Sequence, residues 1–466
     1  MPCWDLAVID FKLSELAARA DGRLHGSDAT VRRVSTNSKD CADSNTLFVA
    51  LKGERFDAHD FIEDARANGA SFFAVSKNVD IDTPYIECGD TLRLLGKAGE
   101  IVRDKSGVKV CSVTGSCGKT TVKEMCLSIL SCMGKTLATK GNFNNDVGVP
   151  LTLLRLDESY DYAVIEQGAS HLNDIKRTCE FVKSQACVIT NVGAAHIEGF
   201  GSYDGVYKGK SEILDDVLER GGFGVVPSDS AYYERWLADY ADYCKTGQLK
   251  TFGFKEGSFV TITNLKESLD GCAFTLVCEN FSADIKLNLL GRHNAQNAAA
   301  ACALCLCMGA DKEAVVRGLN DVQATQGRFN IVDRGDFILI DDSYNASVNA
   351  VLAAIDTLSH FNGFKIFVFS DMGELGDEAV ALHQKIGAYA RLHNIDRMLC
   401  MGPLSMHTVK VMGNHAMHFA NHESLYTFLD SMLNEHVKPV VLVKGSHAMH
   451  MEKIVEPLMN RKCKKC

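Results

Sequence analysis

The chain has 466 residues, of which 46% are hydrophobic and 23% charged, with 38 Gly and only 7 Pro. At about 150 residues per domain this length predicts roughly three domains, and the composition excludes a peptide, a lone binding module and a disordered chain. The formal net charge of −10 offers no general attraction for nucleic acid or an anionic membrane, so an anionic ligand must be held by a local site.

No apolar run approaches the ~20 residues of a membrane-spanning helix, and Asp5 and Asp10 stand where a signal peptide would be basic and then apolar. We therefore expect a cytoplasmic protein without a membrane span. The 18 Cys are scattered through apolar segments, which predicts reduced core thiols. Cys463 and Cys466 form a C-x-x-C without a second Cys or His pair nearby, so no zinc site is expected there.

The order of predicted elements indicates an α/β protein of three domains. A helix at 13–17, a strand at 45–51, a helix at 60–68 and a strand at 71–75 form a small N-terminal α/β domain, residues 1–86. Strands at 108–114, 162–166 and 186–191 alternate with helices, which predicts a central doubly wound, mostly parallel sheet in residues 87–325. After an Ala-rich helix from Asn297, strands at 337–341, 365–369, 398–401 and 440–443 predict a C-terminal Rossmann-like α/β domain, residues 326–466.

A phosphate loop is predicted where the strand at 108–114 ends, in the sequence TGSCGKTT at 114–121. A strand, a Gly loop and a helix N-terminus direct backbone N–H groups and the positive end of the helix dipole at an anion. Lys119 would reach the β- and γ-phosphates, and the Thr120 hydroxyl would bind Mg²⁺. The longer G-x-x-x-x-G-K-[ST] pattern requires Gly where this chain has Val113, so only the shorter T-G-x-x-G-K-T-T form fits. The competing interpretation of the segment is a tight strand-to-helix turn with a surface lysine. The residues expected at the phosphates are Gly115, Ser116, Cys117, Gly118, Lys119, Thr120 and Thr121.

Two side chains follow neighbouring strands near this loop. Glu166 ends the strand at 162–166, and His196 comes shortly after the strand at 186–191. Ligands bind at the carboxyl edge of open α/β sheets, so these residues are candidate Mg²⁺ ligands or water holders. Lys208 and Lys210, near the start of the next predicted helix, would by themselves be solvated lysines.

These motifs resemble those of the Mur ligases, the ATP-dependent amide-forming enzymes of peptidoglycan precursor synthesis, over essentially the whole chain. The segments 341–346 and 48–61 are most similar to the members that add D-alanyl-D-alanine to UDP-N-acetylmuramoyl-tripeptide, and the Asp-Asn-Pro-Arg motif of the diaminopimelate-adding members is absent. The resemblance is carried by the TGSCGKTT loop, KGNFNNDVGVP at 140–150, EQGA at 166–169, AAHIEGFGS at 194–202, GRHNAQN at 291–297, GR at 327–328, DDSYNA at 341–346 and LVKGS at 442–446.

The resemblance implies an activity and a role for each matching residue. ATP would activate a carboxylate as an acyl phosphate, which the amine of D-alanyl-D-alanine attacks while the third domain closes over the site, in a protein that is commonly monomeric. Thr120 and Glu166 would bind one Mg²⁺ and His196 a second, and Lys210 would be carbamylated as a further Mg²⁺ ligand. Other implied roles are Asn294 and Asn297 at adenine, Lys119 and Arg328 at the phosphates, Asp342 at the nucleotide, Tyr344, Asn345 and Lys444 near the amine or acyl phosphate, and Lys39, Lys52, His59, Asn142, Asn144 and Asn145 at the UDP-muramoyl peptide.

The chain departs from the family pattern at three places. Asn37-Ser38-Lys39 replaces Asp-Ser-Arg, so the bidentate fork of arginine is lost, while Gln326 replaces a Pro and His447 an Arg. The alternatives are a folylpolyglutamate synthetase-like ligase, disfavoured by the long segment before the loop, and a regulatory nucleotide-binding protein without catalysis, disfavoured by the intact ATP and Mg²⁺ residues. Whether the third residue of the peptide is diaminopimelate or lysine is not encoded in a motif.

Overall fold

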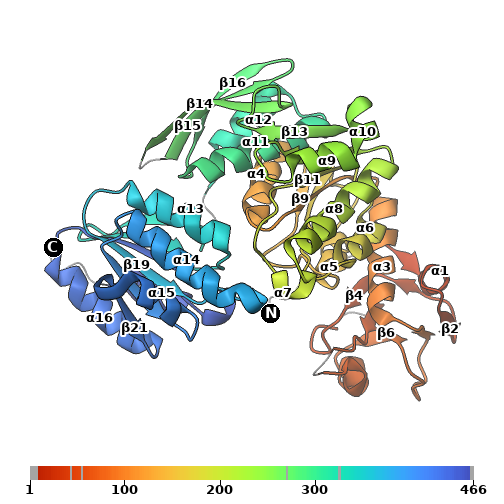
Figure 1. The fold of residues 1–466 in the computed structure, drawn as a ribbon. Coiled ribbons are helices and arrows are strands. Elements are labelled where there is room, and N and C mark those ends of the chain that lie inside the picture. The colour runs from red at the N-terminus through yellow and green to blue at the C-terminus, as the bar shows by residue number, and fades with distance from the viewer. Residues whose placement is uncertain (1–8, 42–44, 54–55, 269–270, 324–326, 462–466) are drawn as a thin grey trace.

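Three large sheets organise the chain, each in its own lobe (Figure 1). The structure is a computed structural model that describes residues 9–41, 45–53, 56–268, 271–323 and 327–461. The central lobe lies between the N-terminal lobe, red to orange, and the C-terminal lobe, cyan to blue (Figure 1). The three-domain α/β class predicted from the sequence is therefore confirmed. The C-x-x-C at Cys463 and Cys466 and the departure from the family pattern at Gln326 lie outside the described residues.

The N-terminal lobe holds a five-stranded sheet in the order β2-β7-β6-β5-β4, parallel except for β2, and a small β1-β3 pair. Its last strand ends at Glu87, one residue beyond the expected boundary of this domain. The elements are β1 Phe11–Lys12, α1 Leu13–Arg19, β2 Arg23–His25, β3 Thr30–Val31, β4 Arg33–Ser35, β5 Thr46–Val49, η1 Ala58–Phe61, α2 Ile62–Ala67, β6 Ala70–Val75 and β7 Tyr85–Glu87.

The central lobe is built on a nine-stranded sheet in the order β16-β15-β14-β13-β12-β11-β8-β10-β9. The strands from β9 to β14 are parallel, and β15 and β16 add an antiparallel edge. The strands are β8 Lys109–Thr114, β9 Thr136–Ala138, β10 Tyr162–Glu166, β11 Ala186–Ile189, β12 Phe223–Pro227, β13 Leu249–Gly253, β14 Val260–Ser268, β15 Gly271–Cys278 and β16 Ser282–Leu287. The helices are α3 Thr91–Ser106, α4 Lys119–Ser131, α5 Gly148–Leu153, α6 Asp174–Val182, α7 Ile197–Phe200, α8 Tyr203–Glu219, α9 Tyr233–Asp239, α10 Ala241–Lys245, α11 Arg292–Cys307 and α12 Lys312–Asn320.

The C-terminal lobe has a six-stranded sheet in the order β17-β18-β22-β19-β20-β21, parallel except for β17. The strands are β17 Asn330–Asp333, β18 Ile338–Asp342, β19 Lys365–Ser370, β20 Arg397–Met401, β21 Ala416–Phe419 and β22 Val440–Lys444. The helices are α13 Val348–Ser359, η2 Gly376–Glu378, α14 Ala379–Leu392, α15 Ser405–Met412, η3 Gly413–His415, α16 His422–Glu435, η4 His447–Met449 and α17 Glu452–Asn460.

Helix α3 ties the N-terminal lobe to the central one. Buried side chains of the first strands and helices share one hydrophobic cluster with α3, β8 and α5. Beside this cluster the Glu100 carboxylate is 2.6 Å from Lys183 Nζ and 2.8 Å from Lys97 Nζ, and Arg19 pairs with Asp104 at 2.8 Å. These ion pairs lower the pKa of Glu100 in spite of its burial. The N-terminal lobe is therefore docked through both apolar and ionic contacts.

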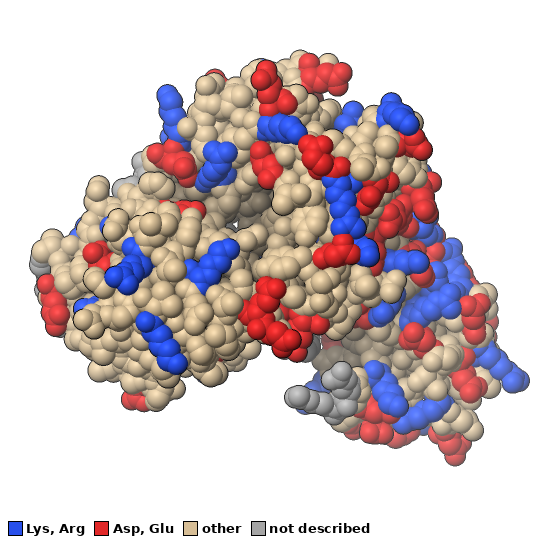
Figure 2. Space-filling model, in the orientation of Figure 1, with Lys and Arg blue, Asp and Glu red and all other residues tan. Residues whose placement is uncertain are grey.

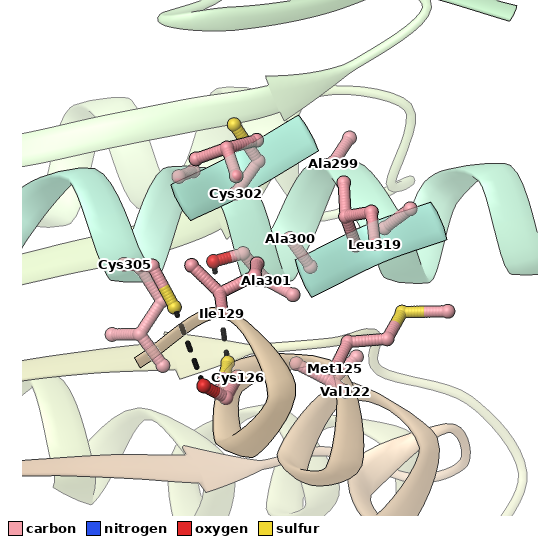
Figure 3. Close-up of a cluster of buried hydrophobic side chains, with 14 of the residues drawn as sticks. Val122, Met125, Cys126, Ile129, Ala299, Ala300, Ala301, Cys302, Cys305 and Leu319 are labelled. Atoms are coloured by element: carbon pink, nitrogen blue, oxygen red, sulfur yellow. Dashed lines mark hydrogen bonds between the residues drawn. The ribbon is translucent and has the colours of Figure 1, made fainter. Parts of the chain in front are cut away.

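The Ala-rich helix α11 packs along α4 in the centre of the molecule (Figure 3). It begins at Arg292, five residues earlier than the sequence analysis expected, because Gly291 precedes it with a φ of +93°. Ala299, Ala300 and Ala301 are fully buried, and their small side chains let the two backbones approach until Cys126 Sγ lies 4.0 Å from the Ala301 carbonyl oxygen. This packing fixes the start of α11 against the start of α4.

The 15 cysteines among the described residues are free thiols, and most are buried. Burial raises the pKa of Cys400, Cys187 and Cys179 far above the usual thiol value, because the thiolate is disfavoured in an apolar surrounding. Within the part of the chain that the structure describes, no helix combines the length and the apolar character needed to cross a bilayer.

The tight α4–α11 contact predicts a stability effect. Replacing Ala301 by Leu adds three carbon atoms at a fully buried position, and such overpacking costs about 1–3 kcal/mol. We expect Ala301→Leu to lower the free energy of unfolding in urea by this amount. The matched control is Ala388→Leu on the exposed face of α14, which should change it by less than about 0.5 kcal/mol; equal effects of both variants would contradict the prediction.

Candidate active site

Parallel pairing of three central strands brings the predicted motifs to one sheet edge. β8 lies between β10 and β11, with Glu166 opposite Val113 and Ile189 opposite Thr114. The loop after β8, the end of β10 and the segment after β11 therefore leave the sheet side by side. This is the carboxyl edge, where open α/β sheets place their ligands.

The loop from β8 to α4 has the shape of a phosphate-binding loop. Gly115 and Gly118 have φ values of +146° and +79°, a region that residues with a side chain rarely adopt. A Cβ on Gly115 would lie 2.0 Å from Thr190 Oγ1, and one on Gly118 would lie 2.6 Å from Asn297 Oδ1. Both glycines are thus required by close neighbours, one on the segment after β11 and one on α11.

Asn191 braces this loop, a role that the sequence analysis missed. Its Oδ1 accepts the Cys117 N–H at 3.0 Å, and its Nδ2 donates to the Cys117 carbonyl at 2.9 Å. Thr190 Oγ1 donates to the same carbonyl at 2.6 Å, and the Ser116 N–H donates to the Asn191 carbonyl at 3.0 Å. The only available signal was that Thr190 and Asn191 are polar residues directly after a buried strand.

The predicted phosphate and metal ligands meet at the end of β10. Thr120 Oγ1 donates to Glu166 Oε2 at 2.9 Å, and Asn144 Nδ2 donates to Glu166 Oε1 at 2.8 Å. Lys119 Nζ donates to the Gly115 carbonyl at 2.7 Å, so the ammonium is folded back onto its own loop. Burial lowers the pKa of Lys119, because its charge is poorly solvated there. An anion in the loop would supply the missing countercharge.

His196 lies at the same edge but points toward the C-terminal lobe. It has a φ of +54° and precedes α7. Its Nδ1 contacts Glu374 Oε2 of the loop after β19, and Ser170 Oγ lies 3.4 Å from the same nitrogen. Glu374 is a second residue that the sequence analysis missed, although it follows a strand as Glu166 and His196 do. Burial and sequence pattern do not reveal which strand ends of different domains face each other.

Lys210 is fully buried, which overturns its interpretation as a solvated lysine. It lies in the third turn of α8 rather than at the helix start, while Lys208 is exposed. Lys210 Nζ donates to the Ala169 carbonyl at 3.0 Å and lies 5.2 Å from the centre of the Phe200 ring. Burial lowers the pKa of Lys210 well below its usual value, and the nearby Lys119 charge lowers it further.

The C-terminal lobe presents charged groups to the loop. Lys444 Nζ lies 2.5 Å from Asp342 Oδ2 and donates to the Asn345 carbonyl at 2.9 Å. Burial raises the pKa of the Asp342 carboxyl, and the Lys444 ammonium offsets part of that rise. The Arg328 guanidinium lies 4.2 Å from the centre of the Tyr344 ring. Asp342 and Lys444, predicted to have separate roles, are therefore paired in this structure.

These groups line one cleft of about 1290 Å³ between the central and C-terminal lobes, and a hollow at this junction is visible in Figure 2. Small-molecule sites usually occupy roughly 300–1,000 Å³, so the cleft has room for a nucleotide and part of a second substrate. The predicted residues that line it are Ser116, Cys117, Gly118, Lys119, Thr120, Thr121, Asn144, Asn145, Glu166, His196, Asn294, Asn297, Arg328, Asp342, Tyr344, Asn345 and Lys444.

Six predicted residues do not line this cleft. Gly115 and Lys210 lie just behind its wall, at Thr190 and Ala169, and Asn142 is exposed outside it. Lys39, Lys52 and His59 belong to the N-terminal lobe.

The three N-terminal residues differ in their surroundings. Lys39 and Lys52 are exposed. His59 is buried, with Nδ1 2.5 Å from Asp57 Oδ1 and Nε2 accepting the Ser76 N–H at 2.9 Å. Both His59 nitrogens are therefore engaged within the lobe.

A phosphate loop that faces a second Rossmann-like domain across a cleft defines the class of this protein: it is a nucleotide-binding α/β enzyme whose chemistry takes place between two domains. Comparison with known proteins identifies the group within that class. Residues 113–305 match the Mur ligase middle domain, and residues 327–447 match the Mur ligase glutamate ligase domain.

A UDP-N-acetylmuramoyl-tripeptide–D-alanyl-D-alanine ligase of Escherichia coli strain K12 is 41% identical over 455 residues, which are 97% of this chain and 99% of that protein. A crystal structure of MurF from Acinetobacter baumannii has a TM-score of 0.91 at 33% identity and covers 98% of this chain and 100% of its own. MurF of Thermotoga maritima in complex with ADP has a TM-score of 0.79 at 27% identity, over 91% of this chain and 96% of its own. The chain belongs to the Mur ligase family.

The Asn191 brace predicts a defect in nucleotide binding. Asn191→Ala removes a donor and an acceptor from the Cys117 peptide group, and hydrogen bonds of this kind contribute about 0.5–1.5 kcal/mol each. We expect the affinity for a non-hydrolysable ATP analogue, measured by isothermal titration calorimetry, to fall about tenfold. Asn191→Asp keeps the acceptor but turns a carboxylate oxygen toward the Cys117 carbonyl and adds negative charge beside the phosphates, so its loss should be at least as large; an unchanged affinity in Asn191→Ala would contradict the role of the brace.

Proposed function

We propose that the chain joins D-alanyl-D-alanine to UDP-N-acetylmuramoyl-tripeptide at the expense of ATP, giving the UDP-muramoyl-pentapeptide used for peptidoglycan synthesis. The observation that carries this proposal is the full-length similarity to ligases of that name, with the phosphate loop, Glu166, His196 and Arg328 gathered at one cleft. Because this similarity includes the N-terminal lobe, it favours this activity over a folylpolyglutamate synthetase-like ligase. The intact loop likewise argues against a purely regulatory protein.

The first step activates a carboxylate. An oxygen of the peptide carboxylate attacks the γ-phosphorus of ATP, the bond to the β-phosphate oxygen breaks, and an acyl phosphate and ADP result. Lys119 and the loop N–H groups would hold the phosphates on one side, and Arg328 would approach from the C-terminal lobe. Positioning and charge neutralisation account for most catalysis of phosphoryl transfer, which matches this distribution of cations. Asn294, Asn297 and Asp342 would hold the rest of the nucleotide.

The residues at the end of β10 fit a magnesium ion. Mg²⁺ in phosphoryl-transfer sites takes one or two protein oxygens and completes its shell with phosphates and water. Thr120 Oγ1 and Glu166 Oε2 are 2.9 Å apart, so both can face one ion. When bound, Mg²⁺ would neutralise phosphate charge; Thr120 and Glu166 would hold one ion and His196 a second.

Lys210 fits a carbamylated lysine. Carbamylation requires a neutral amine, whose nitrogen attacks the carbon of CO₂ and loses a proton to leave an anionic carbamate. Burial and the Lys119 charge favour the neutral amine of Lys210. Its Nζ lies behind the cleft wall at Ala169, from where the longer carbamate would extend toward the metal ligands.

The second step forms the amide. The amine of D-alanyl-D-alanine attacks the acyl carbon, loses a proton, and phosphate leaves. Tyr344, Asn345 and Lys444 would lie near the amine or the acyl phosphate. Closure of the C-terminal domain would exclude the water that hydrolyses an acyl phosphate.

The N-terminal domain would hold the UDP end of the other substrate. Its residues Lys39, Lys52 and His59 do not line the cleft. The segment that contains Asn142, Asn144 and Asn145 would guide the peptide from the N-terminal domain to the cleft.

We divide the chain into domains at 1–86, 87–325 and 326–466. Because both walls of the cleft come from one chain, a monomer would suffice. We expect the reaction to take place in the cytoplasm, where ATP and the nucleotide precursor would be available.

The proposed reaction predicts coupled substrate dependence. We expect phosphate release from ATP and Mg²⁺ only when UDP-N-acetylmuramoyl-tripeptide and D-alanyl-D-alanine are both present, with a UDP-muramoyl-pentapeptide identified by mass spectrometry. Parallel assays with the diaminopimelate and lysine forms of the tripeptide determine which peptide is used. ATP binding without release under any of these conditions would refute the ligase and favour a regulatory role.

Carbamylation of Lys210 predicts a dependence on CO₂. Activity should fall when the enzyme is equilibrated in buffer purged of CO₂ and return when bicarbonate is added. Lys210→Met should lose at least 100-fold in kcat without responding to bicarbonate. The matched control is Lys208→Met, two residues away on the exposed face of α8, which should keep its activity and its CO₂ dependence. A wild-type enzyme indifferent to CO₂ would rule the modification out.

A further inference from the structure

We propose that Glu374 is a positioning residue for His196: across the cleft it accepts the Nδ1–H of the imidazole and so presents the lone pair of Nε2 to a divalent cation at the nucleotide phosphates. The inference rests on the proposed function for the identity of that cation. Glu374 belongs to the C-terminal domain and His196 to the central domain. Glu374 therefore prepares His196 for metal binding only when the two domains meet.

The first observation is the hydrogen bonding of the His196 ring. Glu374 Oε2 and Ser170 Oγ are both at Nδ1, and no hydrogen bond to Nε2 is found among the described residues. A carboxylate accepts hydrogen bonds but cannot donate them, so this contact selects the tautomer with the proton on Nδ1. Metal-binding histidines are commonly oriented in this way, with one ring nitrogen held by a carboxylate and the other left for the metal.

The second observation is that the protein holds Glu374 in place from both sides. Met372 and Leu375, which flank it, are fully or almost fully buried in one hydrophobic cluster that also contains Ala194 and Ile197 of the central lobe. Buried residues close to His196 and close to Glu374 in the sequence therefore belong to one apolar cluster that spans the two lobes. The side chains of His196 and Glu374 themselves remain partly exposed to solvent.

Polar contacts fix the same loop. The Met372 N–H donates to Nε2 of the buried His383 at 3.0 Å. The Asp371 carboxylate accepts the N–H groups of Leu404 at 3.0 Å and Ser405 at 2.7 Å, at the start of α15. The loop after β19 is thus attached to α14 and α15, and the backbone that carries the Glu374 side chain is held in place.

The third observation is backbone conformation. His196 and Glu374 have φ values of +54° and +59°, a backbone conformation that is unfavourable for residues with a side chain and persists only where the surroundings impose it. The Glu198 N–H also donates to the Glu374 carbonyl at 3.4 Å, so the backbones meet as well as the side chains. Two residues from separate domains that both have a left-handed backbone conformation, and whose side chains contact each other, indicate a specific contact at a functional site.

The test compares Glu374→Ala with Glu374→Gln, which keeps an acceptor oxygen but not the charge. In wild-type protein with ¹⁵N-labelled histidine and no nucleotide or metal, at a pH alkaline enough for the ring to be neutral, we expect the His196 resonances, assigned by their loss in His196→Gln, to show the tautomer with the proton on Nδ1. Glu374→Ala should give a mixture of tautomers. Because outer-sphere partners of metal ligands typically contribute about 10–100-fold to metal affinity, Glu374→Ala should raise the Mg²⁺ concentration for half-maximal velocity, and the Mn²⁺ dissociation constant with ADP present, about tenfold or more. For Glu374→Gln, both the share of the Nδ1–H tautomer and the metal requirement should lie between those of the wild type and of Glu374→Ala.

The matched control is Glu378→Ala. Glu378 lies four residues further on and accepts a hydrogen bond from Tyr203 OH at 3.2 Å across the same domain junction, but it does not contact His196. This variant should retain the wild-type tautomer and metal requirement. A wild-type tautomer in Glu374→Ala, or an equal rise in the metal requirement of Glu378→Ala, would overturn the proposal. The tautomer measurement needs no substrate, so it separates failure of this inference from failure of the ligase assignment.

Discussion

The parallel pairing of β8 with β10 and β11 is the constraint on which the site depends. It sets Glu166 opposite Val113 and Ile189 opposite Thr114, so that the phosphate loop, the carboxylate and the Asn191 brace leave the sheet together. A slip of one residue in β10 would turn Glu166 to the other face of the sheet. The buried contact between α4 and α11 (Figure 3) adds the second fixed point. It is accompanied by the close approach of Asn297 to Gly118.

The cleft is completed only by the second domain. The central lobe supplies the phosphate loop and the oxygens of Thr120 and Glu166, while Arg328 and the paired Asp342 and Lys444 come from the C-terminal lobe. Contacts such as that between His196 and Glu374 join the two walls. In the proposed reaction, catalysis would be linked to domain closure, because the charges that would stabilise the transferred phosphoryl group are assembled when the lobes meet.

Two of the departures from the family pattern, at Asn37–Lys39 and at His447, have local structural accounts. At the first, Asn37 Oδ1 accepts the Lys39 N–H at 3.1 Å, so the turn is closed by its own side chain and Lys39 extends into solvent. At the other, the His447 ring lies 5.4 Å from the Tyr344 ring and its N–H donates to Asn345 Oδ1 at 3.4 Å. An aromatic contact thus occupies the position where the family commonly has arginine, and Arg328 covers the Tyr344 ring.

The sequence alone determined the three-domain α/β class, the phosphate loop and the candidate ligands Thr120, Glu166 and His196, because strand periodicity, glycines and polar strand ends are local signals. The tertiary structure decided what depends on contacts between distant segments. It buried Lys210, whose isolated pattern predicted a solvated lysine, and it brought Asn191 to Cys117 and Glu374 to His196. Which strand ends face each other, and which charges lose their water, follows from sheet order and domain docking, and neither is written in any short segment of the chain.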